Sequence, residues 1–269
     1  MNPYERMTTE PVKKLTLKLA LPSIVSMLIS TVYNMVDTWF VSRLGTQATA
    51  AVGISFAIME LINATGFLFG TGSGTRVGLL LGAKEREGAS VMASTACFFA
   101  LLLSAVIALL GLVFLSPLMR LLGSTPTIQP WAETYGRYML LGFPVMTFSL
   151  VLSSISRSEG KNRQAMIGIG CGGVLNMVLD PLFIFSLHGG IAGAALATFL
   201  SQTVGLVILL SFFLTGRTET RLAYSSVRPA KHLLGTILSA GLPSLCRHGA
   251  GTLSAACLNN AAGIYGGMH

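Results

Sequence analysis

Charged side chains are scarce in this sequence. Only 10% of the 269 residues are Asp, Glu, Lys or Arg, whereas 52% are hydrophobic, and the mean hydropathy is +0.70. A soluble domain carries about 25% charged residues. The apolar runs are too long and too many for a soluble core, so the composition predicts an all-α polytopic membrane protein embedded in a lipid bilayer.

Cysteine and histidine are also rare, with four of each. Their wide spacing excludes a disulfide framework and a zinc site, and no Ser/His/Asp or Cys/His arrangement indicates an enzyme. The glycine-rich stretch 70–74 lacks the Gly-Lys-Ser/Thr of a phosphate loop, and we interpret it as the flexible end of a helix. The net charge of +8 does not indicate a nucleic-acid partner, because the basic residues lie in short gaps between apolar runs.

Six apolar runs are long enough to cross a bilayer, which takes roughly 20 residues. We place the six spans at 15–41, 48–74, 89–115, 131–155, 165–187 and 191–214, and a seventh run begins near 233. This divides the chain into an N-terminal cytoplasmic segment (1–14), a six-helix lobe (15–215), a cytoplasmic linker (216–232) and the first helix of a second lobe (233–269).

The loops carry a strong charge bias. Fourteen of the 18 basic residues fall on the side of the N-terminus and of the even-numbered loops. The positive-inside rule therefore places the N-terminus in the cytoplasm, with the spans in the cytoplasmic (inner) membrane.

A short internal repeat supports two lobes. The segment 19–23 near the start of the first span resembles 239–244 near the start of the seventh run. A second copy of a six-helix unit would begin there on the same side of the membrane, as in transporters built from parallel repeats.

The acidic residues Asp37, Glu60 and Asp180 lie inside predicted spans. At 1.5 Å per residue, Asp37 lies roughly 6 Å and Asp180 roughly 10 Å from the outer end of its helix. Asn176 is one turn deeper than Asp180, and Thr198 lies at a similar depth. Two adjacent carboxylates need a proton or a small cation between them. We therefore predict a proton or sodium site at Asp37, Asn176, Asp180 and Thr198; alternatively, these side chains only cap or cross-link helices.

Glu60 lies near the middle of the second span. An ionisable residue at this depth marks a substrate or ion pathway. Glu60 is therefore a candidate to bind a cationic substrate or to take part in proton movement. The alternative is a glutamate that faces a water-filled cleft or hydrogen-bonds to a neighbour.

Several segments resemble the multidrug and toxic compound extrusion (MATE) family. The first span carries Tyr-Asn-Met-Val-Asp-Thr-Trp-Phe-Val-Ser-Arg-Leu-Gly at 33–45, followed by Ala-Ala-Val-Gly at 50–53. The remaining matching segments are 81–84, 157–160, 176–181, 241–244 and 258–266. The resemblance extends over almost the whole chain.

The resemblance implies the six-helix N-terminal lobe of a twelve-helix transporter, plus most of a seventh helix. It implies a proton- or sodium-coupled antiporter, rather than an enzyme, that exports small cationic amphipathic drugs or metabolites and needs no further cofactor. The family's N-lobe cation site falls on Asp37, Asn176, Asp180 and Thr198, and Tyr135 is a further member of the cluster.

Two features depart from the family. The chain stops in its seventh helix, and it reads Gly-Met-His at 267–269 where an acidic, alanine-rich stretch is expected. We interpret it as a truncated lobe that needs its missing C-lobe or a second chain. The seventh run lacks an acidic residue, which favours a DinF-like branch. The alternatives are a lipid-linked saccharide flippase of the same superfamily, which would favour a basic cleft, a channel, or a non-transporting fragment.

Overall fold

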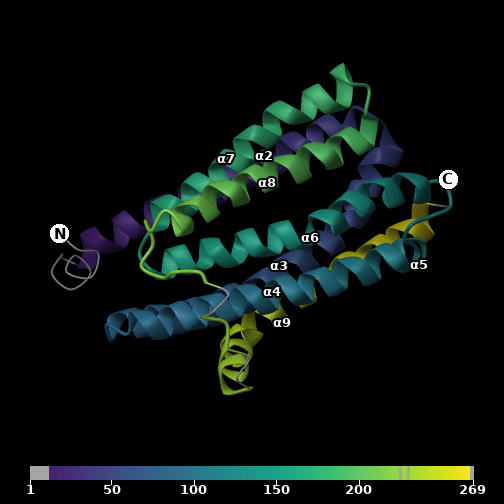
Figure 1. The fold of residues 1–269 in the computed structure, drawn as a ribbon. Helices are drawn as coiled ribbons and strands as arrows, with labels where there is room; N and C mark the ends of the chain where they lie inside the picture. Colours follow the sequence, from purple (N-terminus) through teal and green to yellow (C-terminus); the bar gives the residue numbers. More distant parts are fainter. Residues whose placement is uncertain (1–11, 224–225, 229–230, 267–269) are drawn as a thin grey trace.

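The computed structural model describes residues 12–223, 226–228 and 231–266, and these form helices without any strand. Figure 1 shows them as long rods joined by short loops. The predicted N-terminal segment 1–14 lies largely outside the described residues. The helices are α2 (Val12–Ser42), α3 (Thr46–Gly82), α4 (Arg86–Val113), α5 (Leu115–Leu121), α6 (Gln129–Ser158), α7 (Asn162–Pro181), the π-helical η1 (Leu182–Ser186), α8 (Gly190–Leu214) and α9 (Lys231–Gly266).

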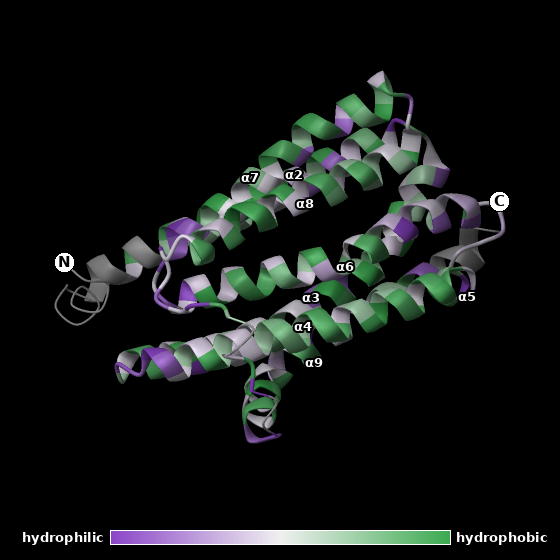
Figure 2. Ribbon diagram, viewed as in Figure 1, coloured by the Kyte–Doolittle hydropathy of each residue, from purple (hydrophilic) through white to green (hydrophobic). Residues whose placement is uncertain are grey.

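The predicted number of spans is confirmed. In the described part of the chain, six helical segments are long and apolar enough to cross a membrane, and they correspond to the six predicted runs. Hydrophobic residues cover the shafts of the helices and hydrophilic residues gather at loops and ends (Figure 2). Many leucines on the shafts are exposed, as a lipid-facing surface requires.

The helices form two groups around α6. In Figure 1, α2, α7 and α8 lie side by side, and α3, α4 and α9 lie on the other side of α6. Helix α3 packs extensively against both α6 and α9, and α7 packs against α8 and α2. Helix α2 also contacts α3, so the two groups of helices meet beside α6.

The second span is longer than predicted. Helix α3 continues through the glycine-rich stretch 70–74 to Gly82, so the prediction that this stretch ends the helix is wrong. The glycines are instead packing positions. A Cβ on Gly72 would lie 2.1 Å from the Ile237 carbonyl oxygen of α9, and one on Gly74 would lie 2.5 Å from the Ser158 hydroxyl of α6. Tertiary packing outweighs the poor helix propensity of glycine here.

Glycines also allow close packing between α7, η1 and α8. A Cβ on Gly172 of α7 would lie 3.1 Å from the Ser201 carbonyl oxygen of α8, and one on Gly168 would overlap Leu209. On α8, a Cβ on Gly193 would lie 2.4 Å from the carbonyl oxygen of Phe183. These contacts draw α8 onto α7 and η1, and so fix Thr198 relative to Asn176 and Asp180.

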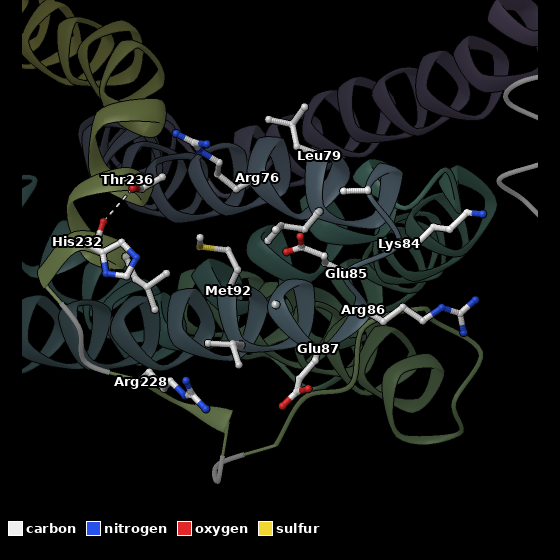
Figure 3. A pocket seen from close by; sticks show the side chains of 15 residues that line it. Arg76, Leu79, Lys84, Glu85, Arg86, Glu87, Met92, Arg228, His232 and Thr236 are labelled. Carbon is white, nitrogen blue, oxygen red and sulfur yellow. Dashed lines mark hydrogen bonds between the residues drawn. The ribbon is translucent and has the colours of Figure 1, made fainter.

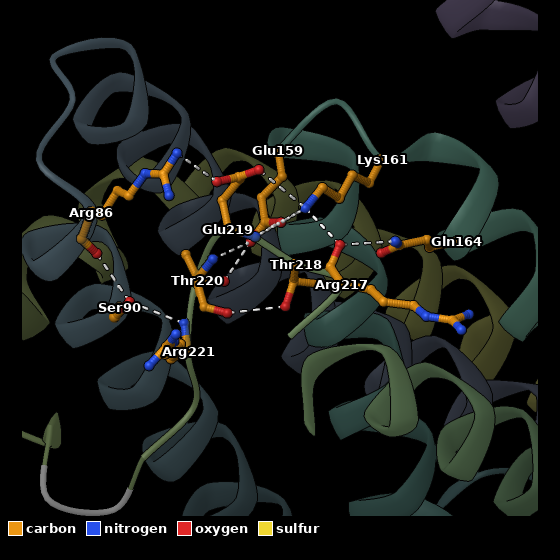
Figure 4. A network of polar contacts seen from close by, with 10 residues as sticks. All are labelled: Arg86, Ser90, Glu159, Lys161, Gln164, Arg217, Thr218, Glu219, Thr220 and Arg221. Carbon is orange, nitrogen blue, oxygen red and sulfur yellow. Dashed lines mark hydrogen bonds and ion pairs between the residues drawn. The ribbon is translucent and has the colours of Figure 1, made fainter. Parts of the chain in front are cut away.

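The linker after α8 is fixed to one end of the lobe by a polar network (Figure 4). The buried Glu159 accepts hydrogen bonds from the backbone N–H groups of Glu219 (2.8 Å) and Thr220 (3.1 Å). Lys161 donates to the Arg217 carbonyl oxygen at 2.6 Å and pairs with Glu219 at 3.4 Å. The network thus connects the predicted inter-lobe linker to the turn between α6 and α7.

Candidate cation-binding site

The four residues of the predicted cation site are all buried, and they come from three adjacent helices. Asp37 lies on α2, Asn176 and Asp180 on α7, and Thr198 on α8. The exposed fraction is 8% for Asp37 and at most 3% for the other three. The structure therefore brings together the residues that the depth estimate grouped.

Hydrogen bonds connect three of them directly. The Asn176 amide donates to Asp180 Oδ1 at 3.1 Å and lies 3.4 Å from the Thr198 hydroxyl. The hydroxyl in turn donates to the Ala194 carbonyl oxygen at 3.1 Å. Asp37 lies close enough to the Asp180 carboxyl group for the two to interact, across the contact between α2 and α7. Two acidic side chains thus share one buried site.

The local sequence places Asp180 at an irregular point of its helix. Pro181 follows it and cannot donate a backbone hydrogen bond, and the chain then widens into the π-helical turn η1. π-Helical turns inside α-helices occur frequently at functional sites. The irregularity sets the direction of the helix immediately after the carboxylate.

Three oxygens of the cluster accept no hydrogen bond from any described residue. They are Asp37 Oδ1, Asn176 Oδ1 and Asp180 Oδ2. A buried polar oxygen without a partner costs free energy. Carboxylate and amide oxygens are the ligands of a hard cation, and a proton shared between two carboxyl groups would also reduce their repulsion. The donor set therefore fits either a sodium ion or a proton.

Two tyrosines adjoin the cluster. Tyr135 of α6 is 3% exposed and lies beside both aspartates and the Thr198 side chain, as the family resemblance implied. Tyr33 lies beside Asp37 and the Gln202 side chain, and the sequence analysis did not select it. Tyr33 precedes Asp37 by four residues, so the i, i+4 spacing on a helix could have identified it.

The cluster opens onto a cavity of about 670 Å³. Its wall includes Asp37, Tyr135 and Glu60. A solute in the cavity therefore reaches the carboxylates of both Asp37 and Glu60. No basic side chain belongs to the described lining. The cavity is therefore acidic.

A larger pocket of about 1160 Å³ lies elsewhere, at the end of α3 and α4 next to α9 (Figure 3). Its lining is mixed in charge, with Arg76, Lys84 and Arg228 beside Glu85 and Glu87. None of the predicted cation-site residues lines it. Size alone therefore does not identify the site of interest.

Glu60 stands apart from the aspartate cluster. Its Oε2 lies 2.9 Å from Nδ1 of His248 on α9, and its Oε1 lies 3.4 Å from the Asn63 amide. The first contact joins residues 188 positions apart in the sequence. Sequence reasoning selected Glu60 but missed His248, since no local spacing connects the two.

Comparison with known proteins agrees with this architecture. The family model MatE matches residues 22–182. A curated relative, the multidrug export protein MepA of Staphylococcus saprophyticus subsp. saprophyticus, is 28% identical over 226 residues, covering 84% of this chain and 50% of its own length. The FAD transporter of Shewanella oneidensis is 31% identical over 200 residues, covering 73% of this chain and 44% of its own length.

A solved structure shows the same arrangement of helices. It is described as the outward-facing conformation of a multidrug resistance MATE family transporter, and it matches with a TM-score of 0.82 and 32% identity. The match covers 88% of this chain and 52% of that one. The chain spans about half the length of the curated relatives it matches. On this basis the chain belongs to the MATE family of multidrug efflux transporters, which are not enzymes.

Proposed function

We propose that this chain is the N-terminal lobe of a cation-coupled antiporter of a DinF-like branch. It lies in the cytoplasmic membrane with its N-terminus in the cytoplasm, and proton or sodium is its coupling ion. The observation that carries the proposal is the buried pair of Asp37 and Asp180, each of which has one buried carboxyl oxygen without a partner among the described residues. A charge inside a membrane is retained where it serves transport.

The coupling ion binds where the two carboxyl groups meet. A sodium ion takes oxygens from Asp37, Asn176, Asp180 and Thr198, whereas a proton bridges the two aspartates. Tyr135 bounds the same pocket from α6 and limits its hydration. The ion alters the contact between α2 and α7, and this contact adjoins the cavity in which a substrate would lie.

The acidic cavity favours a small cationic, amphipathic substrate, with Glu60 as a contact in the cleft. One curated relative is named an FAD transporter, which makes an anionic substrate the second candidate to test. The absence of basic side chains from the described cavity lining argues against that substrate here. Alternating access requires a second lobe, supplied by further sequence or by another chain.

The test measures ion binding by this chain alone, in lipid nanodiscs. Sodium should raise the thermal unfolding temperature of the wild type, because a ligand at 100 times its Kd adds about 2.7 kcal/mol to stability. Asp37→Asn and Asp180→Asn should each abolish this effect, whereas Glu60→Gln, outside the cluster, should retain it. A proton-coupled site would instead stabilise the wild type relative to both Asn variants as the pH falls.

Equal responses of wild type and both Asn variants to sodium and to pH would refute the coupling site. The substrate class is tested separately. A lipophilic cation should bind to the wild-type chain in nanodiscs, and free FAD should not displace it. Displacement by FAD would instead favour the anionic substrate.

A further inference from the structure

Glu60 belongs to a stripe of three side chains on one face of α3. Asn63 and Phe67 follow it at i+3 and i+7, so the three lie above one another along the helix. All three line a cavity of about 590 Å³, and Glu60 and Asn63 also line the cavity of Asp37. The stripe presents a carboxylate, an amide and an aromatic face to one space.

The imidazole of His248 lies on this stripe. Its ring stacks on Phe67, with the ring centroids 5.1 Å apart and the planes inclined by 8°. Its Nδ1 is 2.9 Å from Glu60 Oε2, and both side chains are 17% exposed. A flat, nitrogen-bearing ring therefore already occupies the stripe, held by a hydrogen bond at its edge and by stacking on its face.

The neighbouring Arg247 indicates the protonation state of this ring. Its guanidinium lies 3.2 Å from Nε2 of His248. A guanidinium only donates hydrogen bonds, so Nε2 must accept and the ring proton must lie on Nδ1. In this tautomer His248 donates from Nδ1 to Glu60. Among the described residues, no lysine or arginine pairs with the Glu60 carboxylate, whose side-chain partners are His248 and Asn63.

We propose that Glu60, Asn63 and Phe67 form a recognition site for a planar cation that bears N–H groups, and that His248 occupies this site until the cation displaces it. The inference rests on the proposed function, since it names the substrate class and a competitor for the Glu60 carboxylate. An amidine or an amino-substituted heteroaromatic cation donates to the carboxylate as His248 does. It also gains a cation–π contact with Phe67.

The competition depends on pH. Histidines change charge between about pH 5 and pH 8. The imidazolium would hold Glu60 through a charge-assisted hydrogen bond, which is roughly twice as strong as a neutral one. Acidification therefore strengthens the internal competitor and weakens binding of the external cation. The affinity for the external cation thus falls as the pH falls, whereas protons that bind to the aspartate cluster would stabilise the chain.

Other ionisable groups face the same two cavities. Helix α2 contributes Asp37 and Tyr33, α6 contributes Tyr135 and Arg157, and α4 contributes none to their described lining. On α9, Arg247 lies beside the ring. Asp37 is the acidic neighbour that shares a cavity with Glu60. The test must therefore include variants of the aspartate cluster.

The experiment measures binding of a fluorescent diamidine, diamidinophenylindole, to this chain in nanodiscs at about pH 7.5 and about pH 5.5. The wild-type Kd should rise by roughly fivefold on acidification. His248→Asn and His248→Gln should bind more tightly than the wild type at the lower pH and should lose this rise. Glu60→Gln should lose more than roughly tenfold in affinity at both pH values.

Three controls distinguish this site from the coupling site. The double variant Asp37→Asn/Asp180→Asn should retain the pH-dependent binding of the diamidine even if sodium no longer affects the chain. Phe67→Leu keeps His248 and Glu60, so it should weaken binding several-fold and retain the pH response. Tetraphenylphosphonium, which has no N–H group and is not planar, should displace the diamidine poorly.

The proposal is overturned if both His248 variants keep the wild-type pH response, or if Glu60→Gln binds the diamidine as the wild type does. It is also overturned if the pH response disappears in the Asp37→Asn/Asp180→Asn variant alone. Unchanged diamidine binding in Phe67→Leu would refute the stacking contact. Equal responses of the wild type and both Asn variants to sodium and to pH would refute the coupling site and leave these results as they stand.

Discussion

Replacing Glu159 with glutamine should loosen the linker that follows α8. The wild-type carboxylate is 4% exposed and accepts hydrogen bonds through both oxygens, from the Glu219 N–H at 2.8 Å and from the N–H and hydroxyl of Thr220. Lys161 lies 3.8 Å from the same carboxylate (Figure 4). Glutamine has nearly the same shape but only one oxygen, and its NH₂ group would face a donor.

The expected magnitude follows from the contact that is lost. A hydrogen bond to a charged group contributes roughly 1.5–3 kcal/mol, and a buried donor left unpaired costs roughly 1–3 kcal/mol. The retained oxygen can still accept the hydrogen bonds from Thr220. We therefore expect the free energy of local opening of the linker to fall by about 2 kcal/mol, which increases the open population roughly 30-fold.

Limited trypsin digestion measures this opening, because the linker contains Arg217 and Arg221. Cleavage of a segment that opens and closes rapidly follows the population of its open form. Cleavage after these arginines, measured by mass spectrometry, should be roughly 30-fold faster in Glu159→Gln than in the wild type. The matched control is Glu87→Gln, an exposed carboxylate on the first turn of α4. Equal rates in all three proteins would refute the reasoning.

Further substitutions test packing and ion binding. Gly241→Ala would place a Cβ 1.9 Å from a backbone carbonyl oxygen of α3, so it should destabilise the chain and separate α9 from α3. Gly249→Ala on the same helix meets nothing within 4 Å and should leave the unfolding temperature unchanged or higher. Leu209→Ala, at a fully buried position, should lower the free energy of unfolding by roughly 2–5 kcal/mol. Thr198→Val keeps the shape but removes a hydroxyl from the cluster, so it should weaken sodium binding by roughly tenfold while unfolding changes little.

The spans were predictable from sequence because hydropathy over some 20 residues reports directly on burial in lipid. The ends of the helices were less predictable. Helix α3 runs eight residues past the predicted end at Gly74, to Gly82, since its glycines are covered by α6 and α9. The low helix propensity of glycine can be read from a single sequence. The neighbouring helices that make close packing at a glycine favourable cannot.

The candidate site was likewise only partly predictable from the sequence. Depth along the helix and the i, i+4 spacing placed Asp37, Asn176, Asp180 and Thr198 together, and the structure shows them adjacent. Their role as a coupling site remains a prediction. The partner of Glu60 was not predictable, because contact with His248 depends on how α9 docks onto α3 rather than on any spacing along either helix.

The shared cavity links the two proposed sites thermodynamically. Asp37 and Glu60 line the same space of about 670 Å³, without a basic side chain in its described lining. A cation bound at either carboxylate reduces the negative potential that attracts a cation to the other. Binding at the two sites is therefore antagonistic, and linkage requires the same factor in both directions. If sodium raises the Kd of the diamidine by some factor, the diamidine must raise the Kd of sodium by that factor. This antagonism needs no second lobe, so the present chain should show it at equilibrium.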